Sequence, residues 1–372
     1  MLQSLREFKV GKPQIFAGLL LLAFLAQCLW AAQRWRFFNR EFQYLPATQQ
    51  DNDAREFRVS SPATTAITTL TQGLIRALRK ITTSQNGDAL AIPHPWLFRL
   101  PFVVFGVWLG AALWWVARRL FGDEGGYVAL VLYCFSPSMV IASSRVGPEI
   151  ILAWSSFGLI YTSIGVAHTV YASPRKWIPR ILLLGISIGI CLSTAPWSFT
   201  LVLLAFGFML YLTPGRRSVV VVILGGASAI GLCVSGFFAW FWGNSGMGTA
   251  ALITPRMTWE LVQNLWFVLV DGYLLMALLF LALAAYWAWP RARYFGNTAP
   301  LITSFLTVSL FTLVPAAGLW NPVLGLSFVF IFLGGIAADL LETQARRSWA
   351  FLFVCGGCFR VVSSLLVLGQ QR

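Results

Sequence analysis

Charged side chains are scarce in this sequence, and acidic side chains are the scarcest. Only 11% of the 372 residues are charged, with 13 Asp and Glu against 27 Lys and Arg, while 58% are hydrophobic. The mean hydropathy is +0.73. Soluble domains carry about 25% charged residues, so this composition excludes a water-soluble globular fold. It predicts an all-α fold, a polytopic bundle of transmembrane helices.

The motifs of soluble enzymes are absent, and metal-ligating residues are few. The sequence has no GxxxxGK[ST] or HExxH, and its only histidines are His94 and His168. A four-ligand zinc site is therefore not predicted, and use of a divalent metal is left open. All six cysteines fall in apolar spans. The pair Cys355-Gly-Gly-Cys358 resembles a redox or metal motif, but we favour close helix packing through small residues.

Apolar runs predict about eleven membrane helices. They cover residues 15–32, 100–117, 127–142, 150–171, 181–195, 197–212, 218–242, 263–288, 299–316, 321–341 and 349–368. The runs at 100–117 and 127–142 predict a hairpin whose short turn carries Arg118, Arg119, Asp123 and Glu124. The break at Ala195-Pro196 is the least distinct.

Basic residues alternate between the connections and predict the topology. Every second connection is rich in Lys or Arg, as follows: Arg118/Arg119, Arg175/Lys176/Arg180, Arg216/Arg217, Arg291/Arg293 and Arg346/Arg347. Because cytoplasmic loops carry the excess of Lys and Arg, we expect a cytoplasmic N-terminus and a non-cytoplasmic C-terminus and 34–96 loop. The expected location is the inner membrane of a bacterium, with that loop in the periplasm.

The chain is predicted to form a single membrane domain, residues 1–372, with one long loop at 34–96. Four acids lie close together in that loop, Glu41, Asp51, Asp53 and Glu56. Within it, apolar residues recur at helical spacing over about 62–80, followed by basic ones. This pattern predicts an amphipathic helix suited to lying along the membrane surface.

The net charge of +14 does not indicate nucleic-acid binding. The basic residues stand at the ends of apolar spans, where they set topology and meet anionic lipid head groups. The expected partners are the membrane and a lipid. A polyanionic lipid substrate is one such lipid.

Because the motifs of soluble enzymes are absent, any chemistry must use residues of the external loops or polar residues inside the spans. A carboxylate could remove a proton from an acceptor, and Glu41, Asp51 and Asp53 are the catalytic candidates. Guanidinium groups fit phosphate oxygens. The substrate-binding candidates are Arg99, Arg145, Glu149, His94 and Arg256. The alternatives are structural: Glu41 as an exposed acid paired with Arg40 or Arg36, Arg99 and Arg145 snorkelling to the interface, and Glu149 stabilising a helix N-terminus.

A set of short motifs over residues 93–155 resembles a known family. They are Arg99-Leu-Pro, Gly106 and Gly110, Ala117-Arg-Arg-Leu-Phe-Gly122, Ser136-Pro137, and Ser144-Arg145 followed by Pro148-Glu149. This segment resembles the second to fourth helices of GT-C membrane glycosyltransferases, which include the protein O-mannosyltransferase and aminoarabinose-transferase relatives (glycosyltransferase families 39 and 83). The resemblance extends to 34–80 and, beyond residue 180, rests on span count and topology.

The resemblance implies a polyprenyl-phosphate-linked sugar as donor and transfer on the outer face. It implies that Glu41 matches the Glu of an Asp-Glu catalytic pair in the first external loop, and that Ser61-Pro62 begins the surface helix. In this scheme Glu41 or a nearby loop Asp takes the acceptor proton, and Arg99 and Arg145 neutralise the departing phosphate.

Three departures support a second interpretation. Arg40 stands where the family has its Asp, Asn321-Pro322 stands where relatives carry an Arg-Tyr, and the sequence given stops at Arg372, before the soluble domain of many relatives. The alternative function is a catalytically silent GT-C relative that serves as a scaffold or lipid-binding subunit with membrane protein partners. A transporter is a third hypothesis, for which only Asp271 within a span gives a hint.

Overall fold

The computed structural model is helical throughout the part of the chain that it describes, residues 12–35, 41, 44, 61–82, 95–171, 177–242, 273–313 and 322–342. The α-helices are α2 (Lys12–Arg34), α4 (Pro62–Thr82), α5 (Leu100–Cys134), α6 (Pro137–Ser143), α7 (Pro148–Thr169), α8 (Ile178–Thr194), α9 (Phe199–Leu212), α10 (Arg217–Trp242), α12 (Tyr273–Ala288), α13 (Phe295–Leu313) and α14 (Pro322–Leu341). Short 3-10 turns are η2 (Pro95–Arg99), η4 (Pro196–Ser198), η5 (Pro214–Arg216) and η7 (Pro290–Ala292). The predicted all-α class is confirmed.

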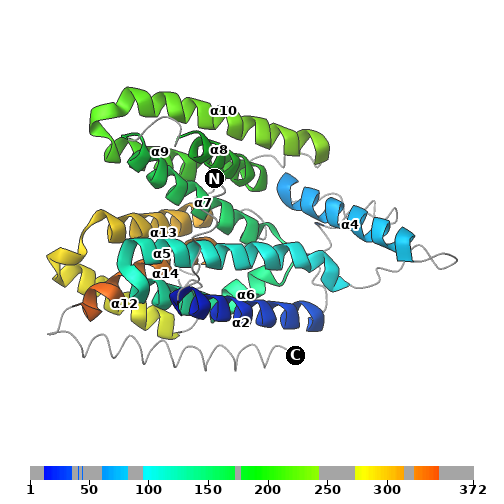
Figure 1. Ribbon diagram of the computed structural model, residues 1–372, viewed down its shortest axis with the longest axis horizontal. Coiled ribbons are helices and arrows are strands. Elements are labelled where there is room, and N and C mark those ends of the chain that lie inside the picture. Colours follow the sequence, from blue (N-terminus) through cyan, green and yellow to red (C-terminus); the bar gives the residue numbers. More distant parts are fainter. Residues whose placement is uncertain are drawn as a thin grey trace.

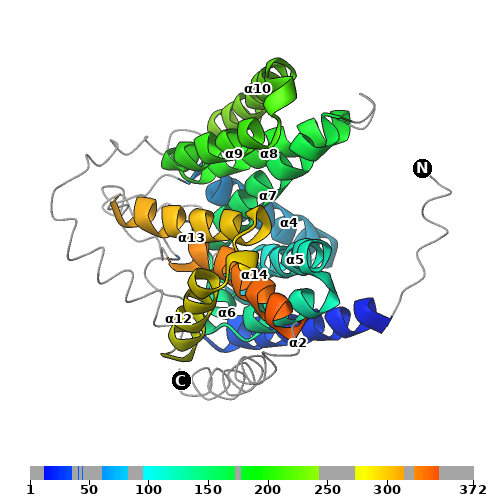
Figure 2. The same cartoon turned by 90° about the vertical axis from the view of Figure 1, so that its left-hand side faces the viewer.

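The helices form a bundle with α2 and α10 on opposite sides and α5, α7 and α14 between them (Figures 1 and 2). Nearly every described side chain of α14 is buried, among them Phe328, Phe330 and Phe332. This agrees with a sequence that is apolar on all sides. In contrast, α2 and α10 expose large apolar side chains such as Leu22 and Val222. Such exposure is expected of helices that face lipid.

The predicted hairpin is present, and its bend is made by one glycine. Gly122 has φ 78° and ψ −174°, a conformation that essentially only glycine adopts. The two limbs of the hairpin lie side by side beyond this bend. The hydroxyl of Tyr133 on the second limb donates to the carbonyl oxygen of Gly106 on the first, 2.6 Å away. The second limb breaks at Ser136 and continues as α6, since Pro137 has no backbone N–H.

The predicted spans agree with the helices in most of the described residues, but the span predicted at 127–142 is interrupted at Ser136, between α5 and α6. Among the described residues, five helical segments are long and apolar enough to cross a membrane: Pro13–Arg34, Trp96–Cys134, Pro148–Thr169, Pro214–Trp240 and Val323–Leu341. Shorter apolar helices cover Ile178–Thr194, Phe199–Leu212 and Leu275–Ala288. The break at Ala195-Pro196 is confirmed between α8 and α9. The predicted span at 349–368, Asp271 and Cys355-Gly-Gly-Cys358 lie outside the described residues. The protein is an integral membrane protein.

The amphipathic helix predicted at 62–80 is α4, but its buried face is not the leucine face. Ala63, Ala66 and Thr68 are buried, and α4 packs against α8 and α10. Leu70 and Leu74 are 60% and 61% exposed. Small side chains permit the close approach to the bundle, so the leucines are left to face the surroundings. The position of α4 on the membrane surface stays a prediction.

The two ends of the bundle have different chemistry. At one end, which we call the Glu41 face, the C-terminus of α2 meets Arg99, Glu41 and the α6–α7 link. The opposite end, which we call the Arg216 face, carries the Gly122 bend, the C-terminus of α7 and the η5 turn. The basic pairs of the sequence predict that the Arg216 face is the cytoplasmic one. This orientation stays a prediction.

Helices α8 and α10 approach each other through glycines. A Cβ on Gly189 would lie 2.5 Å from the Cβ of Val234 and 2.8 Å from the carbonyl oxygen of Gly231. Gly231 in turn faces Ile188, where a Cβ would come within 2.6 Å of the side chain. Since backbone atoms form part of this contact, a side chain on Gly189 cannot be accommodated by rotamer changes alone.

We therefore predict that Gly189→Ala lowers the free energy of unfolding in detergent micelles by about 1–3 kcal/mol, because the helices must separate. The matched control is Gly236→Ala on α10, where a Cβ meets nothing within 4 Å and no loss is expected. Equal thermal unfolding of both variants would contradict the close packing.

Candidate functional site

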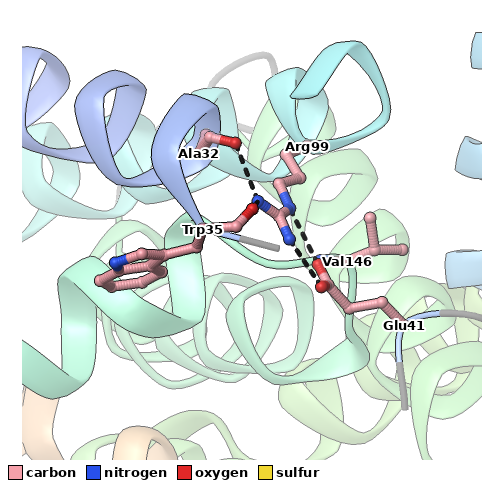
Figure 3. A network of polar contacts seen from close by, with 5 residues as sticks. All are labelled: Ala32, Trp35, Glu41, Arg99 and Val146. Atoms are coloured by element: carbon pink, nitrogen blue, oxygen red, sulfur yellow. Dashed lines mark hydrogen bonds and ion pairs between the residues drawn. The ribbon is translucent and has the colours of Figure 1, made fainter. Parts of the chain in front are cut away.

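Arg99 stands at the junction of three segments on the Glu41 face (Figure 3). Its Nε donates to Oε1 of Glu41 at 3.0 Å and its Nη2 to Oε2 at 2.7 Å. Its Nη1 donates to the carbonyl oxygens of Ala32 at 2.8 Å and Trp35 at 2.9 Å. These contacts use at least four of the five guanidinium N–H groups. Arg99 is therefore a bidentate ion-pair partner and a helix cap at once.

The local sequence explains why an arginine is placed here. Ala32 is in the last turn of α2 and Trp35 follows its end, so their carbonyl groups have no intrahelical donor. The C-terminus of a helix also carries partial negative charge, which a guanidinium stabilises. Arg99 is the last residue of η2 and the N-cap residue of α5, and its side chain reaches across to α2. One cation thus joins the ends of α2 and α5.

Glu41 is buried with its partner. Arg99 is 0% exposed and Glu41 is 2% exposed. Oε1 of Glu41 accepts a further hydrogen bond from the backbone N–H of Val146 at 2.9 Å, which ties the α6–α7 link to the pair. Oε1 accepts two of these hydrogen bonds and Oε2 accepts one, and the side chain is buried, so an acceptor can reach Glu41 only if the surrounding contacts open. The alternatives of an exposed Glu41 and a snorkelling Arg99 are wrong.

Arg145 lies beside the ion pair. Its guanidinium carbon is 5.5 Å from the centroid of the Trp35 ring, and the side chain is half-buried. Stacking on an indole holds a guanidinium plane in one orientation and attracts its positive charge to the ring face. Arg145 follows the buried Ser143 and Ser144, and the hydroxyl of Ser144 donates to the Cys28 carbonyl of α2 at 3.2 Å. The link that carries Arg145 is therefore fixed to α2.

Glu149 lies in the first turn of α7, after the N-cap residue Gly147. Its carboxylate folds back over Gly147, where any Cβ would collide with Oε2. A carboxylate at this position stabilises the positive end of the helix. The structure thus supports the N-terminal interpretation of Glu149, while its predicted role in substrate binding stays a prediction.

The ion pair is also connected to α4. The N–H of Tyr44 donates to the Glu41 carbonyl oxygen at 3.1 Å, and the hydroxyl of Thr68 donates to the Tyr44 carbonyl oxygen at 2.7 Å. Tyr44 and Thr68 are buried. A shift of Glu41 would therefore reach α4 through two hydrogen bonds.

Four of the predicted site residues gather on this face, namely Glu41, Arg99, Arg145 and Glu149. Four others, Asp51, Asp53, His94 and Arg256, lie outside the described residues. The sequence did not predict Trp35, the Val146 amide, Tyr44 or Thr68. Trp35 has a weak signal, since it follows the first apolar span between Arg34 and Arg36. A backbone amide has none.

Metal binding was left open by the sequence. Within the described ranges, no group of three or more His, Cys, Asp and Glu side chains could hold a metal ion.

Away from this face, Asp339 on α14 accepts a hydrogen bond from the buried Asn297 of α13 at 2.9 Å.

The fold is similar to that of ArnT. Crystal structures of ArnT from Cupriavidus metallidurans, in the apo state and bound to undecaprenyl phosphate, match with a TM-score of 0.61 each and 14% sequence identity. The matches cover 91% and 92% of this chain but 61% and 62% of the ArnT chain, so the chain spans about three fifths of the length of that protein. The predicted resemblance is confirmed at the level of the fold.

A family model described as dolichyl-phosphate-mannose-protein mannosyltransferase matches residues 88–241, which is less than half of the chain. This region contains η2, α5, α6 and α7, and therefore Arg99, Arg145 and Glu149. No curated protein matches the sequence.

The buried pair gives a direct test of the site geometry. Glu41→Gln keeps the shape of the side chain but leaves the Arg99 charge buried without a counter-ion. We predict that it lowers the free energy of unfolding by about 3–5 kcal/mol. Combined with Arg99→Met, it should cost less than the two single changes added together.

The control is Arg118→Met, which breaks the partly exposed Arg118–Asp123 pair on the opposite face. Its expected cost is below about 1 kcal/mol. If chemical denaturation gave Glu41→Gln and Arg118→Met the same small effect, the pair would not be a buried structural contact.

Proposed function

We propose that this protein is a membrane glycosyltransferase that takes a sugar from a polyprenyl-phosphate donor at the Glu41 face. The observation that carries the proposal is the arrangement of Arg145 beside the buried Glu41–Arg99 pair, at one end of a bundle with the GT-C fold. The ArnT structure bound to undecaprenyl phosphate supports a lipid phosphate as the ligand class.

Arg145 is the proposed phosphate ligand. Its guanidinium is oriented by Trp35, and the planar fork matches two phosphate oxygens. As the sugar leaves, negative charge grows on the phosphate, and a fixed cation stabilises that charge without reorganisation. Arg99 has most of its N–H groups committed to Glu41 and α2, so in this proposal it positions the face and acts through its neighbours.

The acceptor proton requires a base on the same face. Glu41 is one candidate, acting after its contact with Arg99 or Val146 opens, and Asp51 and Asp53 are the others. Glu149, His94 and Arg256 complete the proposed substrate-binding set. The alternating basic pairs support placing this face outside the cytoplasm, at the periplasmic side of a bacterial inner membrane.

A second candidate function is a catalytically silent scaffold or lipid-binding subunit. The observation that favours it is the engagement of both Glu41 oxygens, together with Arg40 at the position of the family Asp. In that case the pair serves only to hold the fold, and stoichiometric membrane protein partners are expected.

Reconstitution separates the two functions. The purified protein is placed in liposomes with radiolabelled polyprenyl-phosphate sugars, and transfer to an acceptor is measured. We predict turnover by the wild type and a fall of about 10²–10³-fold in kcat for Arg145→Gln, because a donor to the developing charge is lost. Arg118→Gln, on the opposite face, is the control and should retain activity.

Absence of turnover by the wild type with every donor, together with stoichiometric partner subunits in the purified material, would favour the scaffold.

The pH profile of kcat decides whether Glu41 is the base or a positioning residue. If it is the base, Glu41→Asp keeps a shifted acid limb of kcat and Glu41→Gln removes that limb. If it is a positioning residue, both variants lower activity without changing the shape of the profile.

A further inference from the structure

The C-terminus of α7, on the Arg216 face, is capped by three side chains from other segments. Nη1 of Arg180 donates to the Gly165 carbonyl oxygen at 2.7 Å, and Nη1 of Arg216 donates to the Val170 carbonyl oxygen at 2.8 Å. Between them, Nε1 of Trp177 donates to the Thr169 carbonyl oxygen at 2.7 Å. The Trp177 and Arg216 contacts satisfy carbonyl groups at the helix end that have no intrahelical donor, and Arg180 adds a donor to the Gly165 carbonyl, which also accepts from the Thr169 hydroxyl.

The caps bring more positive charge than the helix end can balance. A helix C-terminus carries the equivalent of about half a negative charge, whereas Arg180 and Arg216 bring one full positive charge each. Arg217 follows directly at the start of α10 and is exposed. We call Arg180, Arg216 and Arg217 the basic corner. Its surplus positive charge favours an anion.

The guanidinium groups of the basic corner are held in place. Each of the two capping arginines has one nitrogen bound to a carbonyl, and the guanidinium carbon of Arg216 lies 5.2 Å from the Tyr171 ring centroid. Each guanidinium carries five N–H groups, so the N–H groups of Arg180 and Arg216 that do not bind a carbonyl can still donate to an anion. Holding these side chains in advance lowers the entropy lost when an anion binds.

Exposed aromatic side chains surround the corner. Tyr171 and Tyr211 are exposed, and Trp177 is half-buried with its indole N–H bound to α7. Tyrosine and tryptophan rings collect at the level of lipid head groups. The charge and the aromatic rings therefore stand at the depth where phospholipid phosphates lie.

Three other arginines described on this face lie beside acidic groups or in the same turn as one that does. Arg118 pairs with Asp123, and Arg291 lies 3.5 Å from Glu342, beside the half-buried Asp339. Arg119 stacks on Trp115 of its own helix, one residue from Arg118. Arg293 binds the Trp287 carbonyl and stacks on its ring, in the same turn as Arg291. No ion pair is found at the basic corner among the described residues. Within the part of the chain that the structure describes, its charge thus lacks acidic partners like those around Arg291.

We propose that the basic corner binds the head group of an anionic phospholipid of the bilayer leaflet at the Arg216 face. The phosphate accepts from the exposed N–H groups of Arg216 and Arg217, the tyrosine rings flank the head group, and the acyl chains lie along the apolar side of α10. The site is on the opposite end from the Glu41 face and does not depend on the proposed glycosyl transfer.

Native mass spectrometry of the full chain tests this proposal. The protein is purified with phosphatidylglycerol or with phosphatidylcholine of the same acyl chains, and the retained lipid is counted. We expect the wild type to retain phosphatidylglycerol preferentially. Arg217→Gln should weaken its retention about five-fold, and Arg216→Gln/Arg217→Gln about twenty-five-fold, from the usual attraction of one basic residue to anionic lipid.

Arg293→Gln is the matched control, since it also removes a guanidinium that binds a carbonyl and stacks on an aromatic ring. Its retention of phosphatidylglycerol should stay within about two-fold of that of the wild type. Arg217 makes no capping contact, so Arg217→Gln decides the matter even if the double variant does not fold. Unchanged retention by Arg217→Gln, an equal loss in Arg293→Gln, or equal retention of phosphatidylcholine would each overturn the proposal.

Discussion

The buried pair of Arg99 and Glu41 determines how one end of this bundle is assembled. Removing two charges from water is costly, and their attraction offsets the cost only with good geometry and further hydrogen bonds. Here the guanidinium is bidentate to Glu41 and also caps α2, while the carboxylate accepts from the Val146 amide. Because each partner requires the other, the end of α2, the loop at Glu41, the start of α5 and the α6–α7 link are held in one arrangement.

This arrangement places the residues available for chemistry. Arg145 follows two buried serines on a link fixed to α2, and Trp35 orients its guanidinium. Tyr44 and Thr68 extend the connection to α4, whose exposed leucines lie further along the same helix. A lipid phosphate bound at Arg145 would thus meet a cation whose position is set by the packing of three helices rather than by a flexible loop.

Much of the fold follows from the sequence because helix length and apolar periodicity are local properties. The spans, the hairpin at Gly122 and the limits of α4 were predicted on that basis. The pairing of Arg99 with Glu41 was not, because 58 positions separate them and an arginine beside an apolar span usually reaches toward water. The Val146 amide has no signal in a side-chain pattern. In α4, small residues rather than leucines form the packed face, which periodicity alone does not reveal.

The most direct measurement is an experimental structure of the protein in lipid nanodiscs with a polyprenyl phosphate added. The account predicts density for the phosphate on the Glu41 face, within about 3 Å of the Arg145 guanidinium, as in other charge-assisted contacts. The Arg99–Glu41 pair should be intact beneath it. Density for the phosphate only at the Arg216 face, or an Arg145 guanidinium directed away from the bound lipid, would contradict the account.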